Sequence, residues 1–386
     1  MMDYKRKFLT IIFLLTGILF MYQPLEGQIV FGQPPSGEIK FIYQSWDVTN
    51  HDGEEISLSQ WVIPVFGFVP IQDNLEIVFT SSTAGSSREL NDGSGTVTDA
   101  SLSGLNDSRL AVYASFLEDR VLLGAGVNLP TGKKALDNDE VGVVNLLTES
   151  FLNFPVKNYG EGFGATLEAG YARTFDNLSF GAGAAYVLKA SYEPLEGTDD
   201  YKPGNVIRLG AFGSARRDQF SGRVSVVYNM FGEDELDGNP VFQDGDIFDL
   251  TGEFRYSEDR ISTLLGLRQL IRGKDKRLDA GELVTEAEKS HGAETRVYGE
   301  VGYSATERIG VKALLDYQYV AANGYDEDHV RGFGSSNYFG IGAGLTGVFS
   351  KVLRGVAEFE YFTGSADDSV LDLSGWQLVL GVGASF

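Results

Sequence analysis

The sequence predicts an all-β protein: a transmembrane, antiparallel, up-and-down β-barrel of about sixteen strands, with long extracellular loops and short periplasmic turns. Three observations lead to this prediction. The chain begins with the residue pattern of a secretory signal. It ends in an amphipathic strand whose last residue is the aromatic Phe386. Between these two segments, the breaks between predicted strands alternate between long and short.

Residues 1–27 are predicted to be a signal peptide. Lys5, Arg6 and Lys7 precede the apolar run 8–20, and this order is typical of a secretory signal. The run is short for a membrane-spanning helix, although an uncleaved N-terminal anchor is the alternative. We expect cleavage near Gly27 or Gln28, which leaves residues 28–386 as one barrel domain in the bacterial outer membrane.

The strand predicted at 376–386 has one apolar and one mixed face. Trp376, Leu378 and Leu380 begin the apolar row that ends at Phe386. Lipid requires such a row, whereas a lumen tolerates the other face. An edge strand of a soluble sandwich is the alternative for this strand alone. The pattern resembles the last strand of bacterial outer-membrane barrels, which implies the barrel-assembly machinery as a partner that reads Phe386.

The remaining strands are separated by breaks rich in Asp, Asn and Ser, as reverse turns require. A first strand is predicted near 37–46. The patterns near 58–69 and 75–81 are the weakest of those predicted as strands. If these two segments were not strands, about fourteen strands would remain. Long loops are predicted at 48–56, 82–107, 130–161, 192–204, 231–245, 273–293, 323–336 and 365–373. Short turns are predicted at 70–74, 117–119, 175–177, 216–218, 257–259, 304–307 and 350–353.

Composition limits the classes of function. The chain has no Cys, which excludes a lipoprotein anchor, disulfides and thiol chemistry. Its net charge of -23 argues against nucleic acid as a partner. The acidic runs lie in predicted loops, where solvation and binding of divalent cations are both open interpretations. The sequence has no metal-ligand cluster or phosphate-binding glycine loop, so we expect no metal and no cofactor.

Charged residues within the predicted strands share one face. In 249–255, Asp249, Glu253 and Arg255 alternate with Leu250 and Phe254. A charge on the lipid face at mid-depth costs about 2–4 kcal/mol, so the charged face must point inward. Ion pairs that stiffen the barrel and a polar pore lining remain alternative interpretations. The predicted lumen-lining residues are Arg109, Glu168, Lys189, Arg208, Arg223, Asp249, Glu253, Arg255, Arg268, Arg296, Glu300, Lys312, Asp316, Glu358 and Glu360.

The third long loop, 130–161, contains an apolar row. Val144, Leu147, Phe151 and Phe154 recur at roughly helical spacing, which predicts a helix that begins near Asp139 and Glu140 and ends at Pro155. Such a helix must bury its apolar face. It can fold into the lumen as a constriction, cover the mouth as a hydrophobic site for incoming solutes, or pack against neighbouring loops or lipid.

Residues 104–133 resemble a known family. Gly104-Leu-Asn-Asp107 precedes a strand pair that ends in Leu129-Pro-Thr-Gly132. This pattern is similar to that of the outer-membrane transporters associated with meta-pathway phenol degradation, which broadly resemble fatty-acid and aromatic-hydrocarbon channels. Asn106 stands where that family prefers Gly. The motif residues also have a structural interpretation, since Asp107 can cap the loop before its strand.

These observations predict an outer-membrane channel for passive uptake of small molecules, with hydrophobic or aromatic solutes implied by the resemblance. Its expected partners are outer-membrane lipid and a small-molecule solute. A closed structural or adhesive barrel is one alternative. A rim-type hydrolase is another. The chain has three histidines, here called the loop-end histidines, and all of them lie in predicted extracellular loops: His51, His291 and His329. We therefore expect no enzymatic activity.

Overall fold

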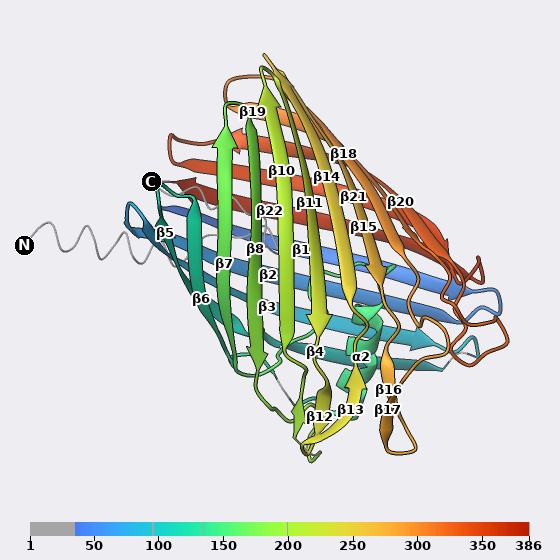
Figure 1. Ribbon diagram of the computed structural model, residues 1–386. Helices are drawn as coiled ribbons and strands as arrows, with labels where there is room; N and C mark the ends of the chain where they lie inside the picture. The colour runs from blue at the N-terminus through green and yellow to red at the C-terminus, as the bar shows by residue number, and fades with distance from the viewer. Residues whose placement is uncertain (1–34, 95, 134, 199, 386) are drawn as a thin grey trace, which may run out of the picture.

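The computed structural model describes residues 35–94, 96–133, 135–198 and 200–385. The predicted signal peptide and Phe386 lie outside these residues. The described strands form one large closed sheet and one small sheet (Figure 1).

Strands of the large sheet pair antiparallel with their neighbours in the sequence, except β4 with β5, and β1 pairs with β22 along its whole length to close the barrel. The strands are β1 (Ser36–Asn50), β2 (Glu55–Gln72), β3 (Leu75–Asn91), β4 (Val97–Leu105), β5 (Ser108–Phe116), β6 (Val121–Leu129), β7 (Gly164–Phe175), β8 (Leu178–Lys189), β10 (Val206–Arg217), β11 (Phe220–Phe231), β14 (Ile247–Glu258), β15 (Ile261–Arg272), β18 (Glu294–Ser304), β19 (Ile309–Val320), β20 (Ser336–Val348), β21 (Leu353–Ala366) and β22 (Leu371–Ser385).

The strands β4 and β5 share one position in the wall. The first half of β3 pairs with β5, and its second half pairs with β4. The seventeen strands of the sheet therefore make a closed barrel with sixteen positions. This result confirms the predicted fold class, including the strand pair that the sequence left least certain.

The barrel has a turn end and a loop end. At the turn end, Asp176, Asp218 and Asp259 each take a positive φ of about 50° in a short turn, a conformation that Asp tolerates better than most residues. The first described strand starts there, and Ser36 pairs with Ser385. The loop end carries the longer connections. In outer-membrane barrels the short turns face the periplasm, so the loop end is extracellular.

Three segments predicted as long loops are instead largely strand. Residues 82–107 form the second half of β3 and all of β4, while 48–56 and 365–373 contain only short turns. The outward side chains here are polar, and the Ser59 and Ser87 hydroxyls lie 2.8 Å apart across β2 and β3. These strand ends extend beyond the lipid, where an apolar row is not needed, and so their sequence resembles that of a loop.

Five shorter strands form a second sheet at the loop end, in the order β17-β16-β13-β12-β9. Two of its hairpins project beyond the barrel (Figure 1). A buried carboxylate joins this sheet to the segment that leads into β10, since Asp234 accepts a hydrogen bond from Gly204 N at 2.6 Å. The strands are β9 (Tyr201–Lys202), β12 (Asp234–Leu236), β13 (Asn239–Gln243), β16 (Lys276–Asp279) and β17 (Glu282–Thr285).

The barrel is apolar outside and charged inside, the reverse of a soluble protein. On β19, Leu315 and Tyr317 are 51% and 41% exposed, whereas Asp316 between them is 4% exposed. Aromatic side chains contribute to the outer face, where the rings of Tyr43 and Trp376 on neighbouring strands stack with their centroids 4.8 Å apart. Such a surface is stable only in contact with lipid, which places this closed barrel in the outer membrane.

No helix in the described part of the chain is long and apolar enough to cross a membrane.

Candidate channel lumen and constriction

The predicted lumen residues lie on the inner face of the wall, and most form ion pairs between strands. Bidentate contacts join Arg296 to Asp316, and the closest nitrogen–oxygen distance is 2.7 Å. Tyr338 donates a hydrogen bond to the same carboxylate at 3.1 Å. Further contacts join Arg268 to Asp249 at 2.5 Å, Arg109 to Glu168 at 2.6 Å, Arg255 to Glu253 at 3.0 Å, and Lys312 to both Glu300 at 2.8 Å and Glu358 at 2.7 Å.

The other predicted lumen residues have different surroundings. Lys189, at the loop end of β8, pairs with Glu161 of the third loop at 2.8 Å. Arg208 donates a hydrogen bond to Asn229 at 2.8 Å. The guanidinium of Arg223 lies 5.1 Å from the centroid of the Phe212 ring. Glu360 lies beside Gly340. A side chain at position 340 would collide with the Glu360 carboxylate.

The third loop contains the helix α2 (Asn138–Thr148). Its N-cap residue, Asp137, accepts a hydrogen bond from Glu140 N at 2.9 Å, and Glu140 accepts one from Asp137 N at 3.0 Å. This reciprocal capping box fixes the start of the helix near the predicted position. The helix ends at Thr148, well before Pro155, so the predicted C-terminus is wrong. Phe151 and Phe154 belong to an irregular segment that follows the helix.

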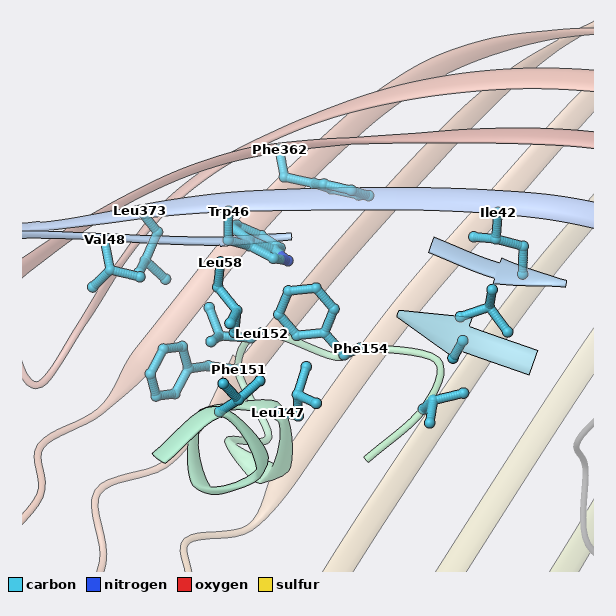
Figure 2. Packing of buried hydrophobic residues seen from close by; sticks show 14 of the residues in the cluster. Ile42, Trp46, Val48, Leu58, Leu147, Phe151, Leu152, Phe154, Phe362 and Leu373 are labelled. Atoms are coloured by element: carbon cyan, nitrogen blue, oxygen red, sulfur yellow. The ribbon is translucent and has the colours of Figure 1, made fainter. Parts of the chain in front are cut away.

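The loop folds into the barrel and forms a hydrophobic core with the inner wall (Figure 2). Leu147, Phe151 and Phe154 are buried, and Val144 packs against them from a partly buried position. The wall contributes Trp46 among other residues, and its ring stacks on Phe362 at 5.2 Å. The predicted apolar row therefore attaches the loop to the wall and does not face water. The wall residues of this core are Ile42, Trp46, Val48, Leu58, Val62, Ala84, Ala100, Leu102, Val320, Tyr338, Phe362, Ala366, Leu373 and Val379.

Three glutamines of the wall bind the backbone of the loop. Gln60 forms two hydrogen bonds with Val156, accepting from its N at 2.9 Å and donating to its O at 2.7 Å. Gln44 donates to the carbonyl of Leu152 at 2.8 Å, and Gln318 donates to that of Ser150 at 2.8 Å. Buried backbone groups need such partners, so these amides fix the path of an irregular segment.

The two halves of the sequence motif at 104–133 meet at Asp107. Its carboxylate accepts hydrogen bonds from Gly132 N at 2.9 Å, Glu161 N at 2.7 Å, Gly162 N at 3.1 Å and the Asn128 amide at 3.2 Å. A side chain at Gly132 would collide with the Tyr159 carbonyl and with Asp107. Asp107 thus joins the start of β5, the end of β6 and the end of the third loop. It forms more contacts than expected for a residue that only caps the loop before its strand.

Two charged residues of the third loop, Lys157 and Glu149, interact with each other, and Lys157 also interacts with charged residues of β15 and β18. Lys157 interacts electrostatically with Glu294, Arg272 and Arg268, and also with Glu149 of its own loop. Burial lowers the pKa of Lys157 and raises the pKa of Glu149. Burial has these opposite effects because it disfavours the charged form of each group.

In the described part of the chain, His291 and His329 contact acidic, aromatic and backbone groups. The ring of His329 stacks on Tyr325 at 4.4 Å, and its Nδ1 accepts a hydrogen bond from Arg331 N at 3.1 Å. His291 Nε2 lies 3.7 Å from Asp275. Desolvation lowers the pKa of His291, which favours its neutral form. Among the described residues, no group of three or more His, Asp or Glu side chains is arranged to hold a metal ion.

The sequence patterns did not indicate Asp107 as a junction, nor the three glutamines as contacts of the loop. A signal for the glutamines was present. Ile42 and Trp46 flank Gln44 on the inner face of β1, and Leu58 and Val62 flank Gln60 on that of β2. Apolar residues on the inner face of a wide barrel indicate that something covers that part of the wall.

Comparison with known proteins finds similar barrels. No family model and no curated protein matches the chain. Solved structures similar to it include a TodX mutant described as a monoaromatic hydrocarbon channel, with 14% identity, a TM-score of 0.49, and coverage of 92% of this chain and 91% of that one. An outer-membrane channel from Pseudomonas putida F1 has 10% identity, a TM-score of 0.39, and coverage of 95% and 100%. OprD from Pseudomonas aeruginosa has 9% identity, a TM-score of 0.42, and coverage of 91% and 95%.

Proposed function

We propose that this protein is a channel for the passive uptake of small molecules, hydrophobic or aromatic ones in particular, and that the third loop is its constriction. The observation that supports the proposal is the position of the loop. It lies inside a closed barrel wide enough to enclose water, and it covers only one side of the wall. The opposite side, from β7 to β18, presents charged side chains to the interior.

The arrangement favours a channel over a closed barrel because its charges and its apolar core are separated. An interior filled for rigidity alone would be covered by packed side chains on all sides. Here the core joins the loop to β1–β4 and β19–β22, while Arg268 and Arg255 on the other wall are 44% and 52% exposed. The chain is proposed to have no enzymatic activity, since the contacts of His291 and His329 among the described residues include no serine or threonine hydroxyl.

A swelling assay with protein-containing liposomes tests the proposal. Benzyl alcohol and a sugar of similar size would report permeation of an aromatic and a hydrophilic solute. Removal of residues 139–156, bridged by a short Gly-Ser linker, should accelerate permeation of the sugar. Removal of the projecting residues 277–284 is the matched control and should leave the rate unchanged. Equal rates for protein-containing and empty liposomes would refute the channel.

A further inference from the structure

An open cavity lies on the outer face of the barrel at its periplasmic end, and its volume is about 610 Å³. Its lining residues come from the turn between β14 and β15 and from the ends of the adjoining strands: Tyr256, Glu258, Asp259, Arg260, Ile261 and Tyr303. Ile261 pairs with Glu258 on one side and with Tyr303 on the other. The side chains of Ile261 and Tyr303 belong to the apolar outer face and are 49% and 45% exposed, so the cavity faces lipid and not the lumen.

The outward side chains around the cavity form a groove along β15. Thr263 is the next outward residue on this strand, and it pairs with Tyr256 of β14 and Val301 of β18, whose side chains are larger. The Tyr256 ring packs against Phe220 with the centroids 5.1 Å apart, which supports one side of the groove. Beyond Thr263 the floor of the groove is Leu265, which is 54% exposed. The groove is therefore polar at the turn and apolar toward the middle of the membrane, as a lipid molecule is.

The turn supplies charges of both signs to this cavity. Glu258, Asp259 and Arg260 follow one another in the chain, and all three are exposed. The Tyr256 hydroxyl donates a hydrogen bond to Oε2 of Glu258, which leaves Oε1 to accept from a ligand. The Arg260 side chain forms no hydrogen bond or ion pair with a described residue. Carboxylates and a guanidinium around one cavity complement a ligand that carries both an ammonium and a phosphate.

We propose that this cavity binds one phospholipid of the periplasmic leaflet, whose headgroup carries a phosphate and a primary ammonium, as in phosphatidylethanolamine. The turn end of the barrel faces the periplasm, so the cavity meets that leaflet. Tyrosine rings prefer the depth at which lipid headgroups begin, and Tyr256 and Tyr303 place the charged turn at this depth. The inference concerns the lipid outside the wall and does not depend on the proposed channel function.

Each part of the lipid has a partner in the groove. Arg260 binds the phosphate, Glu258 and Asp259 bind the ammonium, and an acyl chain runs past Thr263 along the exposed Leu265. A lipid with a quaternary ammonium has no N–H to donate to the carboxylates. An anionic lipid without an ammonium would be repelled by them. The site therefore favours the ethanolamine headgroup over both.

Native mass spectrometry of the refolded full-length protein, titrated with lipid in detergent, tests the site. The probes are phosphatidylethanolamine, phosphatidylcholine and phosphatidylglycerol with identical acyl chains, and the wild type should bind the first most tightly. Arg260→Gln should weaken binding of all three by about fivefold, near the upper limit for an ion pair exposed to water. Glu258→Gln combined with Asp259→Asn should instead remove the preference for phosphatidylethanolamine and leave phosphatidylglycerol binding no weaker. Asn suits position 259 because it tolerates the positive φ found there.

Lys351→Gln is the matched control, because it removes one exposed positive charge from another turn at the same end of the barrel. It should bind each lipid like the wild type. Folding of every variant is checked by the heat-dependent shift of a folded barrel on electrophoresis. Equal affinity of the wild type for the three lipids, a preference for phosphatidylglycerol, or an Arg260→Gln variant that binds like Lys351→Gln would overturn the site.

Discussion

Replacing Asp107 with Ala should release the third loop from the wall. The carboxylate accepts four hydrogen bonds, three of them from the backbone N–H groups of Gly132, Glu161 and Gly162. These donors come from the end of β6 and from the segment just before β7. No other side chain among the described residues accepts a hydrogen bond from these three groups.

The expected loss of folding stability follows from the number of hydrogen bonds that the Asp107 carboxylate accepts. A hydrogen bond to a charged group contributes about 1.5–3 kcal/mol, and a buried donor left without a partner costs about 1–3 kcal/mol. Asp107 is half-buried, so water can reach some of the freed donors. We therefore expect Asp107→Ala to lower the free energy of unfolding by about 3–5 kcal/mol, less than the sum of four such bonds. Asp107→Asn should cost less, since its amide oxygen still accepts.

Urea unfolding of the barrel in lipid vesicles, followed by tryptophan fluorescence, measures this free energy. Asp99→Ala is the control, because Asp99 is exposed on β4 and its side chain forms no hydrogen bond or ion pair with a described residue; its effect should stay within about 0.5 kcal/mol. If Asp107→Ala were as stable as Asp99→Ala, the carboxylate would not hold the junction together, and the role assigned to the motif at 104–133 would be refuted.

Three further outcomes are expected. Replacing Arg255, Arg268 and Arg296 together with Gln should move the reversal potential in a KCl gradient toward cation selectivity, because positive charge is lost from a confined path; an unchanged potential would mean that ions do not pass these side chains. Changing the loop-end histidines to Gln should leave solute permeation intact, whereas its loss would support a rim enzyme. A cysteine introduced at Asp326 should react with an impermeant reagent on whole cells, and labelling only after lysis would reverse the assigned topology.

The fold was predictable because lipid imposes a simple rule. On strands that cross the membrane, apolar residues must alternate with the rest, so β19 could be identified from the alternation along 312–318, where Leu315 and Tyr317 point outward and Asp316 points inward. The rule does not apply where the wall extends into water. There the outward residues are Ser59 and Ser87, and the sequence pattern of a strand is indistinguishable from that of a loop.

The constriction was only partly predictable. The acidic residues Asp139 and Glu140 are local signals, and they indicated the start of α2 to within a residue or two, although the N-cap residue itself is Asp137. Phe151 and Phe154 continued the helical spacing by coincidence, because an irregular segment can also bury an aromatic residue at any position where the wall offers space. The contacts of Asp107 and Gln60 join residues far apart in the chain, and no local pattern specifies which distant N–H group a side chain will meet.

The conductance of single channels in planar bilayers tests the central claim most directly. The wild type and the variant lacking residues 139–156 are compared in the same salt solution. The structure predicts discrete current steps for the wild type and larger steps for the shortened variant, since the loop occupies part of the lumen. Steps of equal size for the two proteins, or no steps for either, would contradict the claim that the third loop constricts an open channel.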